Sequence, residues 1–144
     1  MLDRQLHFLL LRCYYNTSRL IAQRTQSLGL LSGQPKILEC LLEQNGRTPK
    51  EIGRCCALDK STITSLLSKM ERQGLVRRRA QDTDRRSVRI YLTELGLDRA
   101  RQVAEICQEV DRMVLESLTP QQREELLQSL GAILVSLEGI SNVV

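Results

Sequence analysis

The sequence has few of the residue types that mark enzymes, metalloproteins and membrane proteins. It contains one histidine, His7, and no tryptophan, and aromatic residues make up 3% of the chain. A single histidine gives little basis for histidine-dependent catalysis or for an ordinary closed zinc site. The apolar run from Phe8 to Leu11 ends at Arg12, far short of a signal-peptide core or a membrane span. We therefore expect a cytoplasmic protein that is not an enzyme and has no metal and no cofactor.

The cysteines, prolines and glycines do not fit a disulfide-bonded scaffold or a chain with long linkers. The five cysteines are an odd number and form no CxxC motif, which argues against a disulfide framework. Three prolines and eight glycines argue against linkers and low-complexity tracts. With 144 residues, of which 42% are hydrophobic and 26% charged, the sequence is typical of one globular chain over 1–144.

The hydrophobic pattern predicts a mostly α-helical protein with one β-hairpin. Apolar residues recur at helical spacing in six segments, which are 2–28, 34–44, 48–57, 60–73, the stretch after Thr93, and a last helix that opens at Thr119-Pro120-Gln121-Gln122. Thr48, Asp59 and Thr119 are placed to cap the helices that follow them. Val88, Ile90 and Leu92 alternate with polar residues, which predicts a strand. Residues 75–79 are the expected partner strand, and 80–85 the turn.

Two short helices joined by two or three residues form a helix-turn-helix, whose second helix enters the DNA major groove. The predicted helix at 60–73 has an apolar side and a side of small hydroxyl-bearing residues and lysines. We expect these to contact bases or phosphates: Lys60, Ser61, Thr62, Thr64, Ser65, Ser68 and Lys69. Ser and Thr are middling helix formers, so a merely solvated helix face would not favour them. With the hairpin added, the pattern predicts a winged helix-turn-helix.

The positive charge is concentrated around this predicted unit. Residues 47–89 contain twelve Lys or Arg against five Asp or Glu, a net charge of +7 within a chain of net charge +4. A basic middle segment is typical of nucleic-acid-binding modules. The run "RRRAQDTDRRS" at 77–87 falls at the predicted wing, and most such runs simply face water. At a wing tip, however, arginine can enter the narrow minor groove.

Residues 58–96, "LDKSTITSLLSKMERQGLVRRRAQDTDRRSVRIYLTELG", closely resemble the core of MarR-type transcriptional regulators. The specific elements are D-K-S-T at 59–62, M-E-R-Q-G-L-V at 70–76, Asp84-x-Arg86, Leu92-Thr93 and Gly96. The resemblance implies a homodimeric double-stranded-DNA-binding regulator, typically a repressor, on a pseudo-palindromic operator. It implies that Arg86 enters the minor groove and that Asp84 braces it. We expect Arg85 to flank Arg86 on the DNA backbone, and Arg78 to approach a phosphate from the first strand.

The predicted organisation is a DNA-binding lobe at 34–92 with dimerisation helices at 1–30 and 94–144. The terminal helices carry more apolar residues than one small domain needs, which are Leu11, Tyr14, Tyr15, Leu127, Leu134 and Ile140. The alternative is a larger core within one chain.

The resemblance also implies release from DNA by a small, often phenolic, molecule or by an oxidant. Phe8, Tyr14 and Tyr15 are the main candidates for an effector pocket, although 3% aromatic content leaves few rings for stacking. Ala57 stands where the family often has glycine, which predicts a turn that avoids positive φ.

Two alternative functions stay open at this point. In peroxide-sensing members the reactive cysteine would fall at Leu11 here, and Cys13 lies about 200° further around the helix. Redox control through Cys13, or through Cys55 between Arg54 and Lys60, is one alternative. A winged-helix module for protein–protein assembly is the other, and the basic middle segment argues against it.

Overall fold

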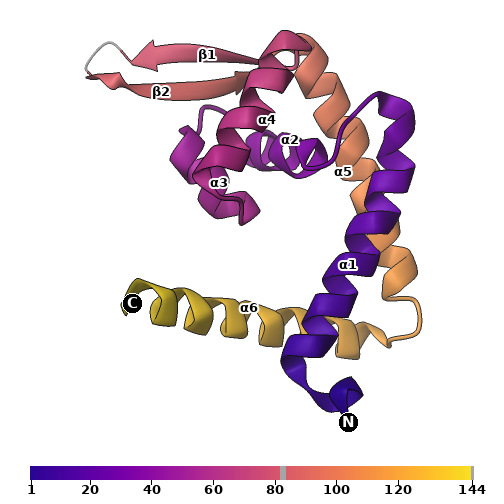
Figure 1. The fold of residues 1–144 in the computed structure, drawn as a ribbon. Helices are drawn as coiled ribbons and strands as arrows, with labels where there is room; N and C mark the ends of the chain where they lie inside the picture. The colour runs from indigo at the N-terminus through magenta and orange to yellow at the C-terminus, as the bar shows by residue number, and fades with distance from the viewer. Residues whose placement is uncertain (82–83, 144) are drawn as a thin grey trace. The chain divides into compact units, whose positions relative to one another are not determined.

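The protein is mostly helical with a two-stranded antiparallel wing, as the sequence predicts (Figure 1). The computed structural model describes residues 1–81 and 84–143. Its elements in chain order are η1 (Leu2–Arg4), α1 (Leu6–Thr25), η2 (Gln26–Leu28), α2 (Gln34–Glu43), α3 (Pro49–Cys56), α4 (Lys60–Arg72), β1 (Val76–Gln81), β2 (Asp84–Leu92), α5 (Glu94–Val114) and α6 (Pro120–Val143). The chain divides into two compact units, Met1–Val110 and Asp111–Val144. The division into a lobe at 34–92 and dimerisation helices stays a prediction.

The core of the first unit lies where α2, α3 and α4 pack together with the base of the wing and with α5. Its largest fully buried apolar side chains are Ile37, Leu38, Leu41, Ile52, Ile63, Leu67, Met70, Ile90, Val103 and Val110. Burying one such side chain contributes about 1.5–3 kcal/mol to folding. The predicted inward stripe of α5 is confirmed at Val103, Cys107 and Val110. It is wrong at Val114, which is 51% exposed at the end of the helix.

A polar contact made by a buried glutamine joins the start of α2 to the end of α4. Gln34, at the start of α2, has no exposed surface. Its Nε2 donates to Oε1 of Gln73 at 2.7 Å, and its own Oε1 accepts from the Leu31 backbone N–H at 3.0 Å. Because a buried amide without partners would cost folding free energy, this pairing fixes the start of α2 against the end of α4.

The predicted helix caps are confirmed. The Thr48 hydroxyl accepts from the Glu51 backbone N–H at 3.2 Å, and the Asp59 carboxylate accepts from that of Thr62 at 2.8 Å. At the start of α6, Thr119 Oγ1 accepts from the Gln122 N–H while Gln122 Oε1 accepts from the Thr119 N–H. These pairs satisfy backbone donors that a helix start leaves open, so the sequence sets these boundaries locally.

The expectation that the turn after α3 avoids positive φ is wrong. Ala57 has φ 54° and ψ 47°, the left-handed conformation. The reason is the way α3 ends. The Leu58 N–H donates to the Gly53 carbonyl at 2.9 Å, a closing bond that requires a left-handed residue between its partners. At this turn an alanine therefore adopts the left-handed conformation that glycine usually supplies.

The wing is longer than the sequence indicates. We predicted strands at 75–79 and 88–92 with a turn at 80–85, but pairing extends from Val76↔Leu92 out to Gln81↔Asp84. Charged and small residues do not prevent this pairing, because the hydrogen bonds between strands join backbone groups. At its base the hairpin is joined to the chain before α3, where the Ile90 N–H donates to the Arg47 carbonyl at 2.9 Å.

A close backbone contact links the wing to α5. The Thr93 hydroxyl donates to the Gly74 carbonyl at 2.5 Å and accepts from the Gly96 N–H at 3.0 Å. A side chain at Gly96 would overlap the Leu75 carbonyl oxygen. Gly96, one of the positions that resemble the MarR pattern, is therefore needed for α5 to begin directly beneath the hairpin.

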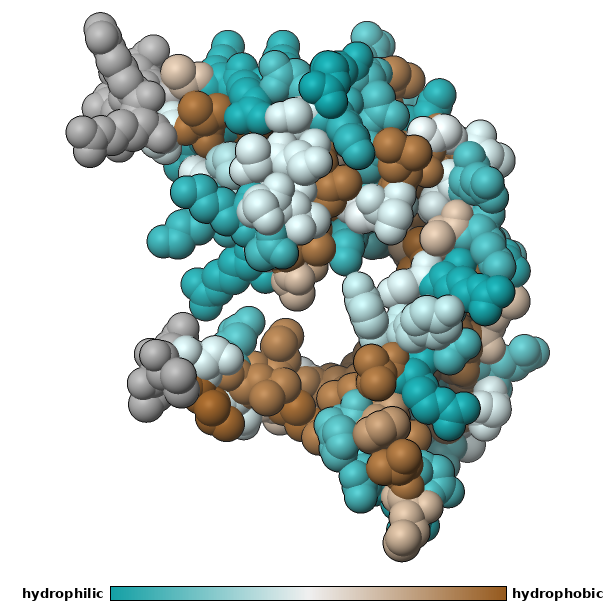
Figure 2. Space-filling view, in the orientation of Figure 1, coloured by the Kyte–Doolittle hydropathy of each residue, from teal (hydrophilic) through white to brown (hydrophobic). Residues whose placement is uncertain are grey.

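The N- and C-terminal helices leave their apolar residues exposed. In the predicted first helix, now divided into η1, α1 and η2, only Thr25 is buried. None of the described residues of α6 is buried, and Figure 2 shows hydrophobic surface along this helix. The exposed large apolar residues of the two helices are Leu6, Leu9, Leu10, Leu11, Tyr14, Tyr15, Leu126, Leu127, Leu130, Leu134, Val135, Leu137 and Ile140. No helix in the described part of the chain is long and apolar enough to cross a membrane.

The left-handed conformation of Ala57 can be tested by substitution with glycine. Ala57→Gly should raise the free energy of unfolding by about 0.5–1 kcal/mol, because the strain of a left-handed alanine exceeds the extra chain entropy of glycine. Gly74→Ala is the reciprocal control, since Gly74 has φ 75° and open space around it, and it should destabilise by a similar amount. Urea unfolding measures both, and a lower midpoint for Ala57→Gly would contradict the conformation found here.

Candidate nucleic-acid interface

The candidate interface is built on α4, whose orientation is set by its buried side. Ile63, Leu67 and Met70 are at most 2% exposed and hold the helix against the core. Their spacing places them on one face of the helix. The opposite face is consequently presented to solvent along the length of the helix.

This outward face carries the predicted contact residues. Lys60, Ser61, Thr64, Ser65 and Lys69 are exposed. Thr62 and Ser68 are half-buried. Short side chains allow a helix to approach base edges closely, and the two lysines supply charge at its ends. The structure thus brings all seven predicted residues of α4 to one surface, whereas their contacts with DNA stay a prediction.

Two of these hydroxyls already donate within the protein. Ser61 Oγ donates to Asp59 Oδ1 and Thr64 Oγ1 donates to the Lys60 carbonyl, both at 2.8 Å. Their oxygens retain the capacity to accept from amino groups in the major groove, such as adenine N6 or cytosine N4. The Thr62 backbone N–H, followed by the Ser61 hydroxyl, holds the pKa of Asp59 below its usual value. Asp59 therefore acts as an ionised cap for the candidate recognition helix.

A basic groove lies beside α4 that the sequence reading did not assign. It is lined by residues of α3, by the start of α4 and by Ser87 and Val88 of β2, and it contains Lys50, Arg54 and Lys60. The missed signal is the spacing of Lys50 and Arg54, which lie one helical turn apart on the short helix α3. Three cations around one groove suit the phosphates of a DNA backbone.

The arginines of the basic segment divide into two groups. Arg78 Nε pairs with Glu71 Oε2 at 2.6 Å, and Arg89 donates to the Gly46 carbonyl at 2.8 Å. Arg47 is largely buried, with 15% of its side chain exposed, and pairs with Glu43 at 3.1 Å. By contrast, Arg77 and Arg79 are exposed on β1. Part of the positive charge thus serves the fold, and the rest faces solvent.

The wing-tip predictions fall at the edge of the described chain. β2 begins at Asp84, which pairs with Gln81. The side chains of Asp84, Arg85 and Arg86 lie outside the described residues, so their expected roles in the minor groove stay predictions.

The predicted effector residues lie on α1, where Tyr14 and Tyr15 are exposed and Phe8 is half-buried. Lys36 Nζ donates to the Tyr14 hydroxyl at 3.4 Å and lies 5.9 Å from the centre of its ring. This hydrogen bond and the lysine charge hold the pKa of Tyr14 below its usual value. The role of these residues in an effector pocket stays a prediction.

Comparison with known proteins agrees with this geometry. A sequence profile of the MarR family matches residues 28–87. The chain is 36% identical over 95 residues to the organic hydroperoxide resistance transcriptional regulator of Bacillus subtilis, a match covering 66% of this chain and 65% of that protein. The matches to two other curated regulators span about half of their length, 49% and 52%. These relatives are transcriptional regulators and not enzymes.

Solved structures show the same fold. A MarR-family regulator from Silicibacter pomeroyi superimposes with a TM-score of 0.84 at 24% identity, covering 94% of this chain and 92% of that one. Staphylococcus aureus MepR, solved as a DNA complex, gives a TM-score of 0.81 at 22% identity, with coverages of 92% and 98%.

Proposed function

The chain belongs to the MarR-type winged helix-turn-helix regulators, and from this premise we propose that it is a homodimeric repressor that binds double-stranded operator DNA in the cytoplasm. The observation that carries the proposal is the outward face of α4. That face combines exposed Ser61, Thr64 and Ser65 with Lys60 and Lys69, and its opposite side is locked in the core.

On DNA, α4 lies in the major groove and each neighbouring element has its own task. Lys60 and Lys69 contact phosphates while the hydroxyls between them contact base edges. Lys50 and Arg54 of the adjacent groove follow the backbone of the same site. At the wing tip, Arg86 enters the minor groove, oriented by Asp84, and Arg85 contacts the backbone beside it.

Dimerisation accounts for the exposed apolar surface of the terminal helices. Leu127 and Leu134 are each 56% exposed, and Leu11 is 58% exposed, in the single chain. Large apolar side chains exposed along a helix are typical of an interface. Two copies related by a two-fold axis would present two recognition helices to a pseudo-palindromic operator, as dimeric helix-turn-helix proteins do.

Release from the operator by a small molecule is the third part of the proposal. An effector that binds near Phe8, Tyr14 and Tyr15 would act where α1 meets the DNA-binding lobe. The Lys36 contact to Tyr14 supports this, because it joins α1 to α2 of the lobe. Such an effector shifts DNA affinity only by its differential affinity for the free and DNA-bound states.

Selection of bound sequences from a random double-stranded DNA pool tests the proposal as a whole. We expect a two-fold-related motif, and an affinity for it that falls steeply with salt because phosphate contacts release counterions. A protein-assembly module would instead select no motif and show little dependence on salt. An enriched motif without two-fold symmetry would support DNA binding by this chain and would contradict the proposed homodimer.

Two wing arginines give a sharper comparison. Arg86→Ala should weaken operator binding by roughly 1–3 kcal/mol, because it removes a minor-groove contact. Arg78→Ala should cost clearly less, because the Arg78 guanidinium is already paired with Glu71. Gel-shift titrations at one salt concentration measure both, with circular dichroism to check folding. Equal losses would mean that the wing acts as a diffuse basic patch.

A charged substitution on α6 tests the proposed dimer interface. Leu127→Glu should convert the dimer into monomers at micromolar concentration, because one charge is buried twice in a two-fold interface. Ser129→Glu is the matched control, since Ser129 is an exposed polar residue about 200° further around the same helix. Sedimentation equilibrium measures the oligomeric state of both variants. A Leu127→Glu chain that stays dimeric would place the interface elsewhere.

A further inference from the structure

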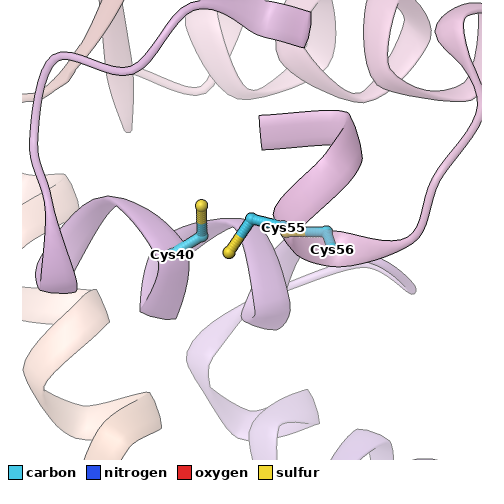
Figure 3. A group of neighbouring side chains, drawn as sticks. All are labelled: Cys40, Cys55 and Cys56. Atoms are coloured by element: carbon cyan, nitrogen blue, oxygen red, sulfur yellow. The ribbon is translucent and has the colours of Figure 1, made fainter. Parts of the chain in front are cut away.

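Three cysteines that are separated in the sequence meet between α2 and α3. Cys40 lies on α2, and Cys55 and Cys56 end α3 (Figure 3). Their three Sγ atoms all lie within 4.8 Å of one another. The sequence reading considered Cys55 only as a single reactive thiol, and it missed the group because helical packing alone brings Cys40 to it.

The three thiols differ in their access to solvent. Cys40 is 4% and Cys56 9% exposed, whereas Cys55 is an exposed residue. Burial raises the pKa of Cys40 well above its usual range and that of Cys56 to about 11. The Cys56 thiol donates to the Lys36 carbonyl at 3.5 Å. At neutral pH the two buried thiols are therefore protonated, and the group is open to solvent at Cys55.

Positive charge lies close to this group. The Arg47 guanidinium acts against the rise in the pKa of Cys40, and the Lys36 ammonium acts likewise on Cys56. Arg47 Nε is buried and has no hydrogen-bond partner among the described residues. A buried N–H donor without a partner is unfavourable, and negative charge on the sulfurs would favour its burial.

The ligand set selects the class of ion. In the described part of the chain, the group contains three sulfurs and neither a histidine nor a carboxylate. Zinc in structural sites takes four protein ligands, whereas soft monovalent copper is bound by thiolates. With metal–sulfur bonds of about 2.3 Å, three sulfurs in a plane around one ion lie about 4 Å apart. Each sulfur pair would need to close by less than about 1 Å.

We propose that Cys40, Cys55 and Cys56 form a three-thiolate binding site for a soft, thiophilic cation of the copper(I) type. The ion enters at exposed Cys55. Three S–H bonds break, three metal–sulfur bonds form, and three protons leave to solvent, so that one monovalent ion and three thiols give a complex of charge −2. No oxidation state changes, so the step needs no oxidant. Lys36 and Arg47 offset the added negative charge.

A bound ion would join α2 to α3 inside the candidate DNA-binding lobe. Because the ion binds the folded arrangement and not separated cysteines, it should stabilise the fold in proportion to its affinity. This site goes beyond DNA binding, and its measurement needs no DNA. Failure of the metal site and failure of the proposed regulator function are therefore distinguishable.

The experiment is an anaerobic titration of the reduced full-length chain with copper(I) against a chromophoric chelator. We expect one ion per chain, a near-ultraviolet sulfur-to-copper absorption band and a higher melting temperature. Zinc(II), titrated in parallel, should bind more weakly. Tighter binding of zinc than of copper(I) would overturn the assignment to a soft cation.

Matched variants separate the site from other thiols. Cys55→Ser should lower copper(I) affinity at least 100-fold, about the upper limit for loss of an outer-shell partner. Cys13 is also exposed, and Cys13→Ser should leave the copper(I) affinity unchanged. Cys40→Ala should abolish the absorption band, whereas Cys107→Ala, which also changes a buried thiol, should retain it.

Two further outcomes would overturn the proposal. One is equal copper(I) affinity in the unmodified chain and in Cys55→Ser. The other is a chain that binds no copper(I) but forms a Cys40–Cys55 disulfide with mild peroxide, detected by mass spectrometry. That result would make the group a redox pair and not a metal site.

Discussion

The burial of Ile63, Leu67 and Met70 along one side of α4 is the constraint on which the candidate interface depends. Three large apolar side chains on one helical face fix the rotation of the helix about its axis, because any other rotation would expose them to water. The outward position of Thr64, Ser65 and Lys69 follows from that rotation and needs no contacts of its own. A face made of middling helix formers can thus persist at little cost, because the core supplies the stability that the face does not.

Besides the packing of the core, close contacts to the backbone join the hairpin and α5 to α4. The α4 C-terminus runs directly into the hairpin, and Thr93 and Gly96 join the hairpin base to α5. Such contacts tolerate little change in side-chain volume, as the overlap at Gly96 illustrates. The arginines of the segment divide between such contacts and solvent. Arg89 binds the Gly46 carbonyl and Arg47 pairs with Glu43 of α2, whereas Arg77 and Arg79 are exposed on β1.

The sequence predicted the features that are set locally. Helix caps at Thr48, Asp59 and Thr119 depend on residues within one turn, and the buried stripe of α4 depends on spacing alone, so both could be read directly. Ala57 could not, because its left-handed conformation is imposed by the bond from Leu58 to Gly53 and not by alanine's own preference. The extent of the hairpin was missed because the sequence of its outer part has no hydrophobic alternation to detect. The cysteine group was missed because two helices must pack before Cys40 meets Cys55.

The two proposed sites share α3, a helix of two turns. Its first turn carries Lys50, and its last turn carries Arg54 together with Cys55 and Cys56. A helix this short moves as one body, so drawing its C-terminal sulfurs toward Cys40 would also move its basic residues relative to α4. Ion binding and phosphate binding would then act on one structural element. If the ion changes the free energy of DNA binding, thermodynamic linkage requires DNA to change the free energy of ion binding by the same amount.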